Sequence, residues 1–278
     1  MLEQAVVRTV PLGGAYRLRL EDGTEVVAKR HDHESGVLAE AAGLRWLADA
    51  VAGTDSAGFR CPLVVTHDAE WLVIDAVPTG SASVAAAESF GRGLAALHRS
   101  GAGGFGAPPP GGPADAWIGL APMRNETGPD WPRWYAEHRI LRYLRTAVDQ
   151  GVLHDHGPIE AVCERIGELA GPAEPPARLH GDLWSGNVLW GADGHVWLID
   201  PAAHGGHRET DLAMLHLFGC PHLERIVAAY DEADPLADGW RVRIALHQLF
   251  PLLVHTVLFG GGYGAQAVAA ARAALTGL

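Results

Sequence analysis

Three polar side chains in one part of the sequence have types and a spacing suited to phosphoryl transfer. Asp182 and Asn187 lie five residues apart in HGDLWSGN, residues 180–187, whose Gly, Asp, Ser and Asn favour a loop. Asp200 ends the apolar stretch HVWLID. A loop carboxylate can accept the proton of a substrate hydroxyl, while an amide oxygen and a second carboxylate are hard ligands for Mg²⁺. We therefore predict Asp182 as the catalytic base and Asn187 and Asp200 as ligands of Mg²⁺, the alternative being turn residues that cap local backbone.

A lysine inside an apolar strand forms a second candidate group with a downstream glutamate. Lys29 lies in EVVAKR, where a lysine is unexpected without a partner, and Glu40 follows 11 residues later. Such a pair holds nucleotide phosphates in kinases, so we predict an ATP site; an outward-facing lysine and a solvated glutamate are the alternative. Gly13 and Gly14 would let backbone N–H groups approach the phosphates, but they are equally compatible with a plain hairpin turn.

Residues around these two groups are candidates for binding the substrate or supporting the loop. Trp184 lies two residues after the predicted base and would form an apolar wall for a sugar-like substrate. In GHRETDLAM, residues 206–214, carboxylates in the first turn of a helix are stabilised by its dipole, which is one explanation for Glu209 and Asp211. The other is that Asp211, with His180, supports the catalytic loop and that His207 or Glu209 faces the substrate.

The first 77 residues contain five short stretches with the composition of strands. A helix is expected after the third stretch, over residues 34–50, because its apolar residues recur at helical spacing. The segment EDG at 21–23 predicts a hairpin turn. The expected strands are 4–10, 15–20, 25–30, 61–67 and 71–77.

The rest of the chain reads as mainly helical. Two short strands, 188–190 and 195–200, follow the catalytic stretch, and the expected helices are 83–101, 130–151, 156–171, 208–218, 222–233, 240–259 and 263–276. These elements predict an α+β fold with a small β-rich lobe and a larger helical lobe, and the arrangement of Asp182, Asn187 and Asp200 makes a protein-kinase-like fold the expected one. Residues 1–77 would be a nucleotide-binding lobe and 78–278 a catalytic and substrate-binding lobe. Near the hinge between them, Asp75 and Val77 are predicted to contact the nucleotide.

Composition limits the possible partners. The 278 residues are 48% hydrophobic and 19% charged, which is typical of a globular protein. A net charge of −12 argues against general binding to nucleic acid or to an anionic membrane. The three cysteines are far apart, and no basic segment leads into a long apolar run at the start, so we expect a cytoplasmic protein. The apolar stretch 244–259 carries His247 and Pro251, among other interruptions, and is expected to be a buried core helix.

Four stretches resemble the fructosamine kinases (ketosamine-3-kinases), a family within the fold shared with aminoglycoside and choline kinases. They are DWPRWYAEHRI at 130–140, LHGDLWSGNV at 179–188, LIDPAAHGGHRETDLAM at 198–214 and HQLFPLLVHTVLFG at 247–260. The resemblance implies phosphorylation, dependent on ATP and Mg²⁺, of the 3-hydroxyl of a ketoamine such as fructosamine or ribulosamine, or of a glycated amine. The phosphorylated product tends to release its amine, which implies deglycation. A monomer or weak homodimer is expected.

The sequence departs from the family at two places. The first loop keeps only Gly13 and Gly14 and lacks the cysteine that supports redox-controlled dimers in some members. His204 and Gly205 stand where an aromatic pair is common, which would widen or re-polarise the sugar pocket. Another small-molecule kinase of this fold, acting on an aminoglycoside, choline or amino-alcohol, is the main alternative, and a nucleotide-binding pseudokinase scaffold is a further one. The predicted kinase residues, all present together, argue against the scaffold.

Overall fold

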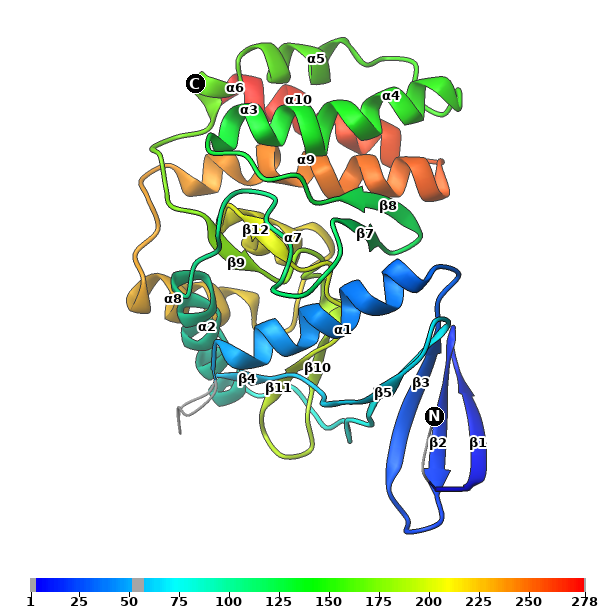
Figure 1. Ribbon diagram of the computed structural model, residues 1–278. Coiled ribbons are helices and arrows are strands. Elements are labelled where there is room, and N and C mark those ends of the chain that lie inside the picture. The colour runs from blue at the N-terminus through cyan, green and yellow to red at the C-terminus, as the bar shows by residue number, and fades with distance from the viewer. Residues whose placement is uncertain (1–3, 52–57, 278) are drawn as a thin grey trace.

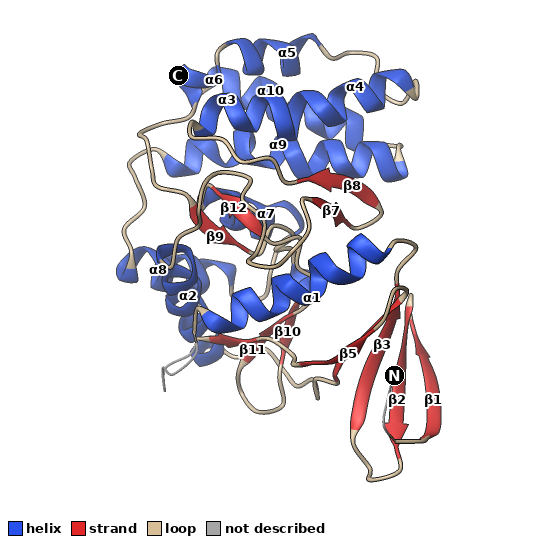
Figure 2. Cartoon of the chain, viewed as in Figure 1, coloured by secondary structure: helices blue, strands red, loops and turns tan. Residues whose placement is uncertain are grey.

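The chain combines an N-terminal antiparallel sheet with a mainly helical remainder. The computed structural model describes residues 4–51 and 58–277. Figure 1 shows the sheet at one end of the molecule, and Figure 2 shows helices gathered at the other. Its strands run in the order β1-β2-β3-β6-β5, and helix α1 (Glu34–Asp49) follows the third strand, as predicted. The five strands are β1 (Val6–Leu12), β2 (Ala15–Leu20), β3 (Glu25–Arg30), β5 (Val64–His67) and β6 (Trp71–Asp75).

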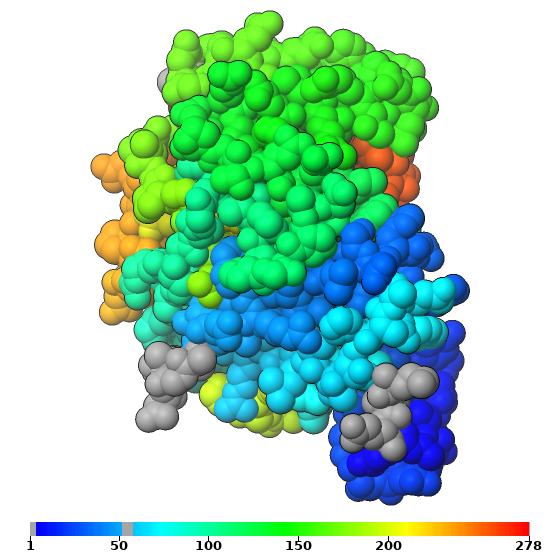
Figure 3. Space-filling model, viewed as in Figure 1, coloured from blue at the N-terminus to red at the C-terminus, as the bar shows by residue number. Residues whose placement is uncertain are grey.

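Alternating apolar residues explain why β3 lies at the centre of this sheet. Val27 belongs to the core shared with α1, whereas Val26 and Ala28 pack on the opposite face. Strand β1 is an edge strand, and all seven of its residues are exposed. In the space-filling view, these first strands (dark blue) project from the body of the molecule (Figure 3).

The predicted helices are present, with two differences in continuity. The segment predicted as one helix over 130–151 contains a π-helical turn, η1 (Ala136–Ile140), between α3 (Trp131–Tyr135) and α4 (Leu141–Asp149). The segment predicted over 156–171 is divided at Arg165. The remaining helices are α2 (Val84–Arg99), α5 (Gly157–Glu164), α6 (Ile166–Leu169), α7 (Glu209–Phe218), α8 (Leu223–Ala233), α9 (Trp240–Phe259) and α10 (Tyr263–Thr276).

Several short strands connect distant parts of the chain, and only β10 (Val188–Trp190) and β11 (Val196–Leu198) were predicted among them. β11 pairs in parallel with β4 (Phe59–Arg60), and β12 (His204–Gly206) pairs with β9 (Ala177–Leu179). A hairpin of β7 (Asp115–Ile118) and β8 (Ala121–Arg124) lies between α1 and the C-terminal helices (Figure 1).

Two large apolar clusters form the core. One lies among α3 to α6, α9 and α10 and includes Trp131, Trp134 and Tyr135. The other runs from α1 and β6 through α2 to β10, β11, α7 and α8, so the N-terminal and C-terminal parts share a core. Helix α9 is long and apolar enough to cross a membrane by length and composition alone. Leu249 and Leu253 are fully buried, however, which fits the predicted core helix.

Candidate active site

A cleft of about 450 Å³ brings half of the predicted site residues together. Its walls come from the N-terminal sheet, α1, the β7–β8 hairpin and the stretch that follows β9. A second hollow, on the outer face of the sheet around Tyr16 and Trp71, contains none of the predicted site residues. The predicted residues on the cleft wall are Gly14, Lys29, Glu40, Asp182, Trp184, Asn187 and Asp200.

The catalytic stretch begins as a sharp turn after β9. Gly181 has a φ of +82°, and a Cβ there would lie 2.1 Å from the carbonyl oxygen of Ala202. Only glycine fits this turn, because both its backbone angle and its surroundings exclude a side chain. The backbone N–H of Asp182 donates to Nδ1 of His180 (3.3 Å). The proton of this imidazole is therefore on Nε2, which donates to the carbonyl of Ile199 (3.0 Å).

Asp211 supports this turn from the first turn of α7, which is the second of the two roles that the sequence left open. Its carboxylate accepts hydrogen bonds from the backbone N–H groups of His180 (2.8 Å) and Gly181 (3.0 Å). His98 lies 3.2 Å from the same carboxylate and 2.8 Å from the hydroxyl of Tyr230. Burial opposes ionisation, but the contact with His98 and the bond from Gly181 outweigh it and hold the pKa of Asp211 below its usual value.

Asp182 and Asn187 are joined directly. The amide nitrogen of Asn187 donates to the carbonyl oxygen (2.8 Å) and to the carboxylate (3.0 Å) of Asp182. Burial raises the pKa of Asp182 to about 7, although the bond from Asn187 acts in the opposite direction. A carboxylate of this pKa near a cleft is suited to accept a proton at neutral pH.

Lys29 links β3 to α1 and to the end of the catalytic stretch. Its ammonium lies 2.7 Å from the carboxylate of Glu40 and also forms an ion pair with Asp200. His31 lies 3.2 Å from the second oxygen of Glu40. Burial would raise the pKa of Glu40, but Lys29 and His31 lower it below the usual value. The predicted Lys–Glu pair is therefore formed in this structure.

The donor set fits a magnesium ion. Asn187 uses its amide nitrogen for Asp182, which leaves its Oδ1 for a cation. Asp200 has a φ of +54°, rare for a residue with a side chain and typical of strained functional positions. Its carboxylate is 45% exposed and already paired with one cation, Lys29. Carboxylate and amide oxygens are ligands that Mg²⁺ prefers, so Asn187 and Asp200 are the residues that would hold it.

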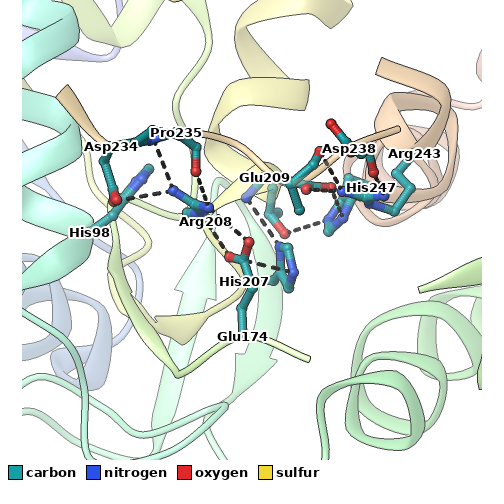
Figure 4. A network of polar contacts seen from close by, with 12 residues as sticks. His98, Glu174, His207, Arg208, Glu209, Asp234, Pro235, Asp238, Arg243 and His247 are labelled. Atoms are coloured by element: carbon teal, nitrogen blue, oxygen red, sulfur yellow. Dashed lines mark hydrogen bonds and ion pairs between the residues drawn. The ribbon is translucent and has the colours of Figure 1, made fainter. Parts of the chain in front are cut away.

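The prediction that His207 or Glu209 faces the substrate is wrong in this structure. Both are about 2% exposed and neither lines the cleft. The two carboxylate oxygens of Glu209 accept hydrogen bonds from Arg243, at 2.8 and 2.5 Å, and His247 lies 3.3 Å away (Figure 4). Burial opposes ionisation of Glu209, but the bonds from Arg243 and the proximity of His247 lower its pKa to about 2. Glu209 thus joins α7 to α9.

The same group has the side-chain types of a metal site. Ligand atoms of His207, Glu209 and His247 all lie within 4.8 Å of one another. Arg243 already supplies the positive charge, however, and the Nδ1 of His207 accepts the N–H of Glu209 (3.2 Å). The neighbouring Arg208 is held in turn by Glu174. These pairings describe a structural network.

Five further residues of the sequence analysis lie away from the cleft wall. Gly13, Asp75 and Val77 do not line it, so nucleotide contacts through them stay predictions. His204 and Gly205 are buried in β12, and a Cβ at Gly205 would lie 2.0 Å from the carbonyl of Gly104. His204 and Gly205 therefore do not line the cleft, and Gly205 packs against the 101–115 loop.

His31, Trp117 and Asn125 are among the residues on the cleft wall that were not predicted. Trp117 stacks on His33 with ring centroids 4.3 Å apart, and its indole N–H donates to the hydroxyl of Ser35 (3.0 Å). These contacts attach β7 to the start of α1. A tryptophan just after the Gly/Pro-rich segment 101–115 was a usable signal, because an indole so placed needs a packing partner.

Comparison with known proteins identifies the family of this site. The family described as fructosamine kinase matches residues 7–276. The chain belongs to the fructosamine kinase family. A protein named probable ketoamine kinase from Thermus thermophilus is 35% identical over 243 residues, 87% of this chain and 84% of its own length. A crystal structure from Thermobifida fusca, provisionally assigned as a fructosamine-3-kinase, has 46% identity and a TM-score of 0.89, covering 98% of this chain and 95% of its own.

More distant solved structures show the same fold. A choline/ethanolamine kinase family protein from Mesorhizobium loti has 17% identity and a TM-score of 0.62, covering 96% of this chain and 88% of its own. The predicted α+β kinase-like fold is thereby confirmed. As a member of the fructosamine kinase family, the protein is a phosphotransferase that acts on a sugar hydroxyl, and membership implies the use of ATP.

Proposed function

We propose that this protein transfers the γ-phosphoryl group of ATP, with Mg²⁺, to the 3-hydroxyl of a ketoamine such as fructosamine or ribulosamine, free or on a glycated amine. The observation that carries the proposal is the cleft itself. It is lined by the Asp182 carboxylate, the Lys29–Glu40 pair and the side chains of Asn187 and Asp200. Release of the amine from the unstable product would make the reaction a deglycation step.

Each of these residues has a separate role in the proposed reaction. Asp182 accepts the proton of the attacking hydroxyl as the oxygen–phosphorus bond forms and the bond to the ADP leaving group breaks. Lys29, fixed by Glu40, holds the nucleotide phosphates. Trp184, 39% exposed on the cleft wall, offers an apolar face to the sugar. Asn187 and Asp200 would hold Mg²⁺, which would supply positive charge to offset that of the phosphates.

Two lobes of the chain would enclose the cleft. Residues 1–77 would act as the nucleotide-binding lobe and 78–278 as the catalytic and substrate-binding lobe, with Asp75 and Val77 at the hinge. The protein would act in the cytoplasm as a monomer or weak homodimer, without binding nucleic acid or membrane.

Replacement of the base tests the mechanism. Asp182→Ala removes the proton acceptor, so we expect kcat to fall by about 100-fold or more. Binding of Mg-ATP should remain within a few-fold of the unchanged protein, because the Lys29–Glu40 pair is kept. Coupled detection of ADP measures turnover, and a thermal shift with Mg-ATP measures binding.

Asp193→Ala, on the turn between β10 and β11, serves as the matched control. Asp193 pairs with Arg60 and does not line the cleft. Unchanged turnover in Asp182→Ala would refute the assignment of the base. Binding of ATP by the unchanged protein, without transfer to any ketoamine, would favour the scaffold alternative.

A further inference from the structure

Arg139 is a fully buried cation that forms no ion pair with a carboxylate in the described parts of the chain. Its guanidinium donates to the carbonyl of Arg124 (3.2 Å) and to Oδ1 of Asn125 (3.0 Å). Its charged group lies over the rings of Trp134 and Phe250, at 4.5 and 5.5 Å. Burial lowers its pKa to about 10, so the group stays charged at neutral pH. Buried arginines are normally paired with acids, and this one instead holds the end of β8.

The backbone at Arg139 is also unusual. It lies in the π-helical turn η1, between two α-helical segments. Such turns are rare and are frequent at functional sites, because they redirect side chains within a helix. Here the turn carries the one residue of that segment that reaches Asn125.

Asn125 lies at the end of β8 and on the wall of the cleft, and it is 4% exposed. An arginine side chain has donors and no acceptor, so the amide oxygen of Asn125 must be the end that faces Arg139. Its amide nitrogen, Nδ2, then has no hydrogen-bond partner within residues 4–51 and 58–277. A buried donor without a partner is uncommon in folded proteins and calls for an explanation. Its place in the cleft wall offers one.

We propose that Asn125 recognises the acceptor substrate: its Nδ2 donates a hydrogen bond to a hydroxyl or carbonyl oxygen of the sugar, and Arg139 is the positioning residue that fixes the amide in this orientation. This inference rests on the proposed function. The hairpin that carries Asn125 is separate from β3, which carries the phosphate-binding Lys29. It also carries Trp117, which lines the same cleft. Within this proposal the amide therefore serves the acceptor and not the nucleotide.

The variant Asn125→Asp separates recognition from a purely structural role. Aspartate has the same shape, keeps an acceptor for Arg139 and gives that cation a counter-charge, so the melting temperature should not fall. It replaces the donor with an acceptor, which would face the lone pairs of the substrate oxygen. We expect the KM for a synthetic fructosamine to rise at least about 10-fold, while the KM for ATP stays within twofold.

Two companion variants complete the test. Arg139→Lys keeps the charge but loses the planar fork, so it should raise the KM for the ketoamine by a smaller factor. Asn125→Ala removes the donor without adding an acceptor, so the same KM should rise in it as well. A lower melting temperature with unchanged KM for the ketoamine in these variants would assign Asn125 and Arg139 to folding alone.

The outcomes distinguish failure of the proposed function from failure of the inference about Asn125. If the unchanged protein phosphorylates no ketoamine, the proposed function fails and this inference fails with it, before any variant is made. If the unchanged protein phosphorylates fructosamine and Asn125→Asp has the same KM for it, this inference alone is overturned. A rise in the KM for ATP of similar size would also overturn it, because the amide would then serve the nucleotide.

Discussion

Two glycines determine the conformation of the catalytic loop, each for a steric reason. A Cβ at Gly181 would lie 2.1 Å from the carbonyl oxygen of Ala202, and a Cβ at Gly186 would lie 2.2 Å from the ring of Trp184. The first position brings Asp182 beside the chain segment that follows Asp200. The second lets the indole of Trp184 lie against the backbone on the cleft wall.

The turn at Gly181 predicts a large loss of stability on substitution. Gly181→Ala should lower the free energy of unfolding by about 3 kcal/mol or more, because strain at positive φ adds to a clash with backbone. Gly194→Ala is the matched control: its φ is +80° and nothing lies within 4 Å, so it should lose only about 1 kcal/mol. Urea unfolding of both variants measures the difference, and equal losses would contradict the role of the Ala202 contact.

Burial of His204 predicts a dependence of stability on acid. Burial, with the nearby charge of Arg139, lowers the pKa of His204 to about 3. The unfolded chain therefore binds this proton first, and stability falls as pH drops from about 6.5 towards 3. Between pH 7 and pH 5 this group should remove about 2 kcal/mol.

The variant His204→Asn isolates that contribution. Asparagine retains a donor for the carbonyl of Ala202, to which Nδ1 of His204 lies at 2.8 Å. Its unfolding free energy, measured in urea at pH 7 and pH 5, should fall by about 2 kcal/mol less than that of the unchanged protein. The same substitution at exposed His154 controls for loss of a surface histidine. If all three proteins lose the same unfolding free energy between pH 7 and pH 5, His204 does not cause the acid dependence.

Sequence patterns found the residues whose chemistry is local and missed those whose role depends on distant contacts. Asp182, Asn187 and Lys29 carry their signal in short stretches, and all three line the cleft. Asn125 has no such signal in MRNETG, because its role depends on Arg139. Arg139 follows Trp131 and Tyr135 at intervals of four residues, which places it on the apolar face of the predicted helix. A charged residue on that face was a sign in the sequence that Arg139 has a buried polar partner.

At the scale of elements, the five-stranded sheet was predictable and the small strands were not. Alternating apolar residues and turn signals define β1, β2 and β3 locally. The pairs β4–β11 and β9–β12 contain only two or three residues in each strand and join segments far apart in the sequence. Periodicity is invisible in such short stretches, because their partners come from the tertiary fold.

Helices α7 and α9 are joined by a buried ion pair, which predicts the effect of removing it. Glu209→Gln leaves Arg243 buried without its counter-charge, so the free energy of unfolding should fall by about 3 kcal/mol. The KM for the ketoamine should stay within twofold, because Glu209 does not line the cleft. Urea unfolding and steady-state kinetics measure the two effects. Full stability together with a raised KM would return Glu209 to the substrate site.

At the scale of the whole molecule, the cleft is assembled from both parts of the chain. Lys29 and Glu40 come from the N-terminal part, Asp182 and Asp200 from the C-terminal part, and the second apolar cluster continues between them. The ion pair of Lys29 with Asp200 spans the cleft. Transfer of a phosphoryl group requires the side chains of both parts to keep fixed positions relative to one another. The shared core holds the two parts together and so supports the site.

The position of the transferred phosphate distinguishes a ketosamine-3-kinase from the other kinases of this fold. The protein is incubated with ATP, Mg²⁺ and, in parallel, a synthetic fructosamine, a ribulosamine, an aminoglycoside and choline, and each product is examined by NMR. We expect phosphate on the 3-hydroxyl of a ketoamine, and no product from Asp182→Ala. Phosphate on the aminoglycoside or choline alone, or on a different hydroxyl of the ketoamine, would contradict it.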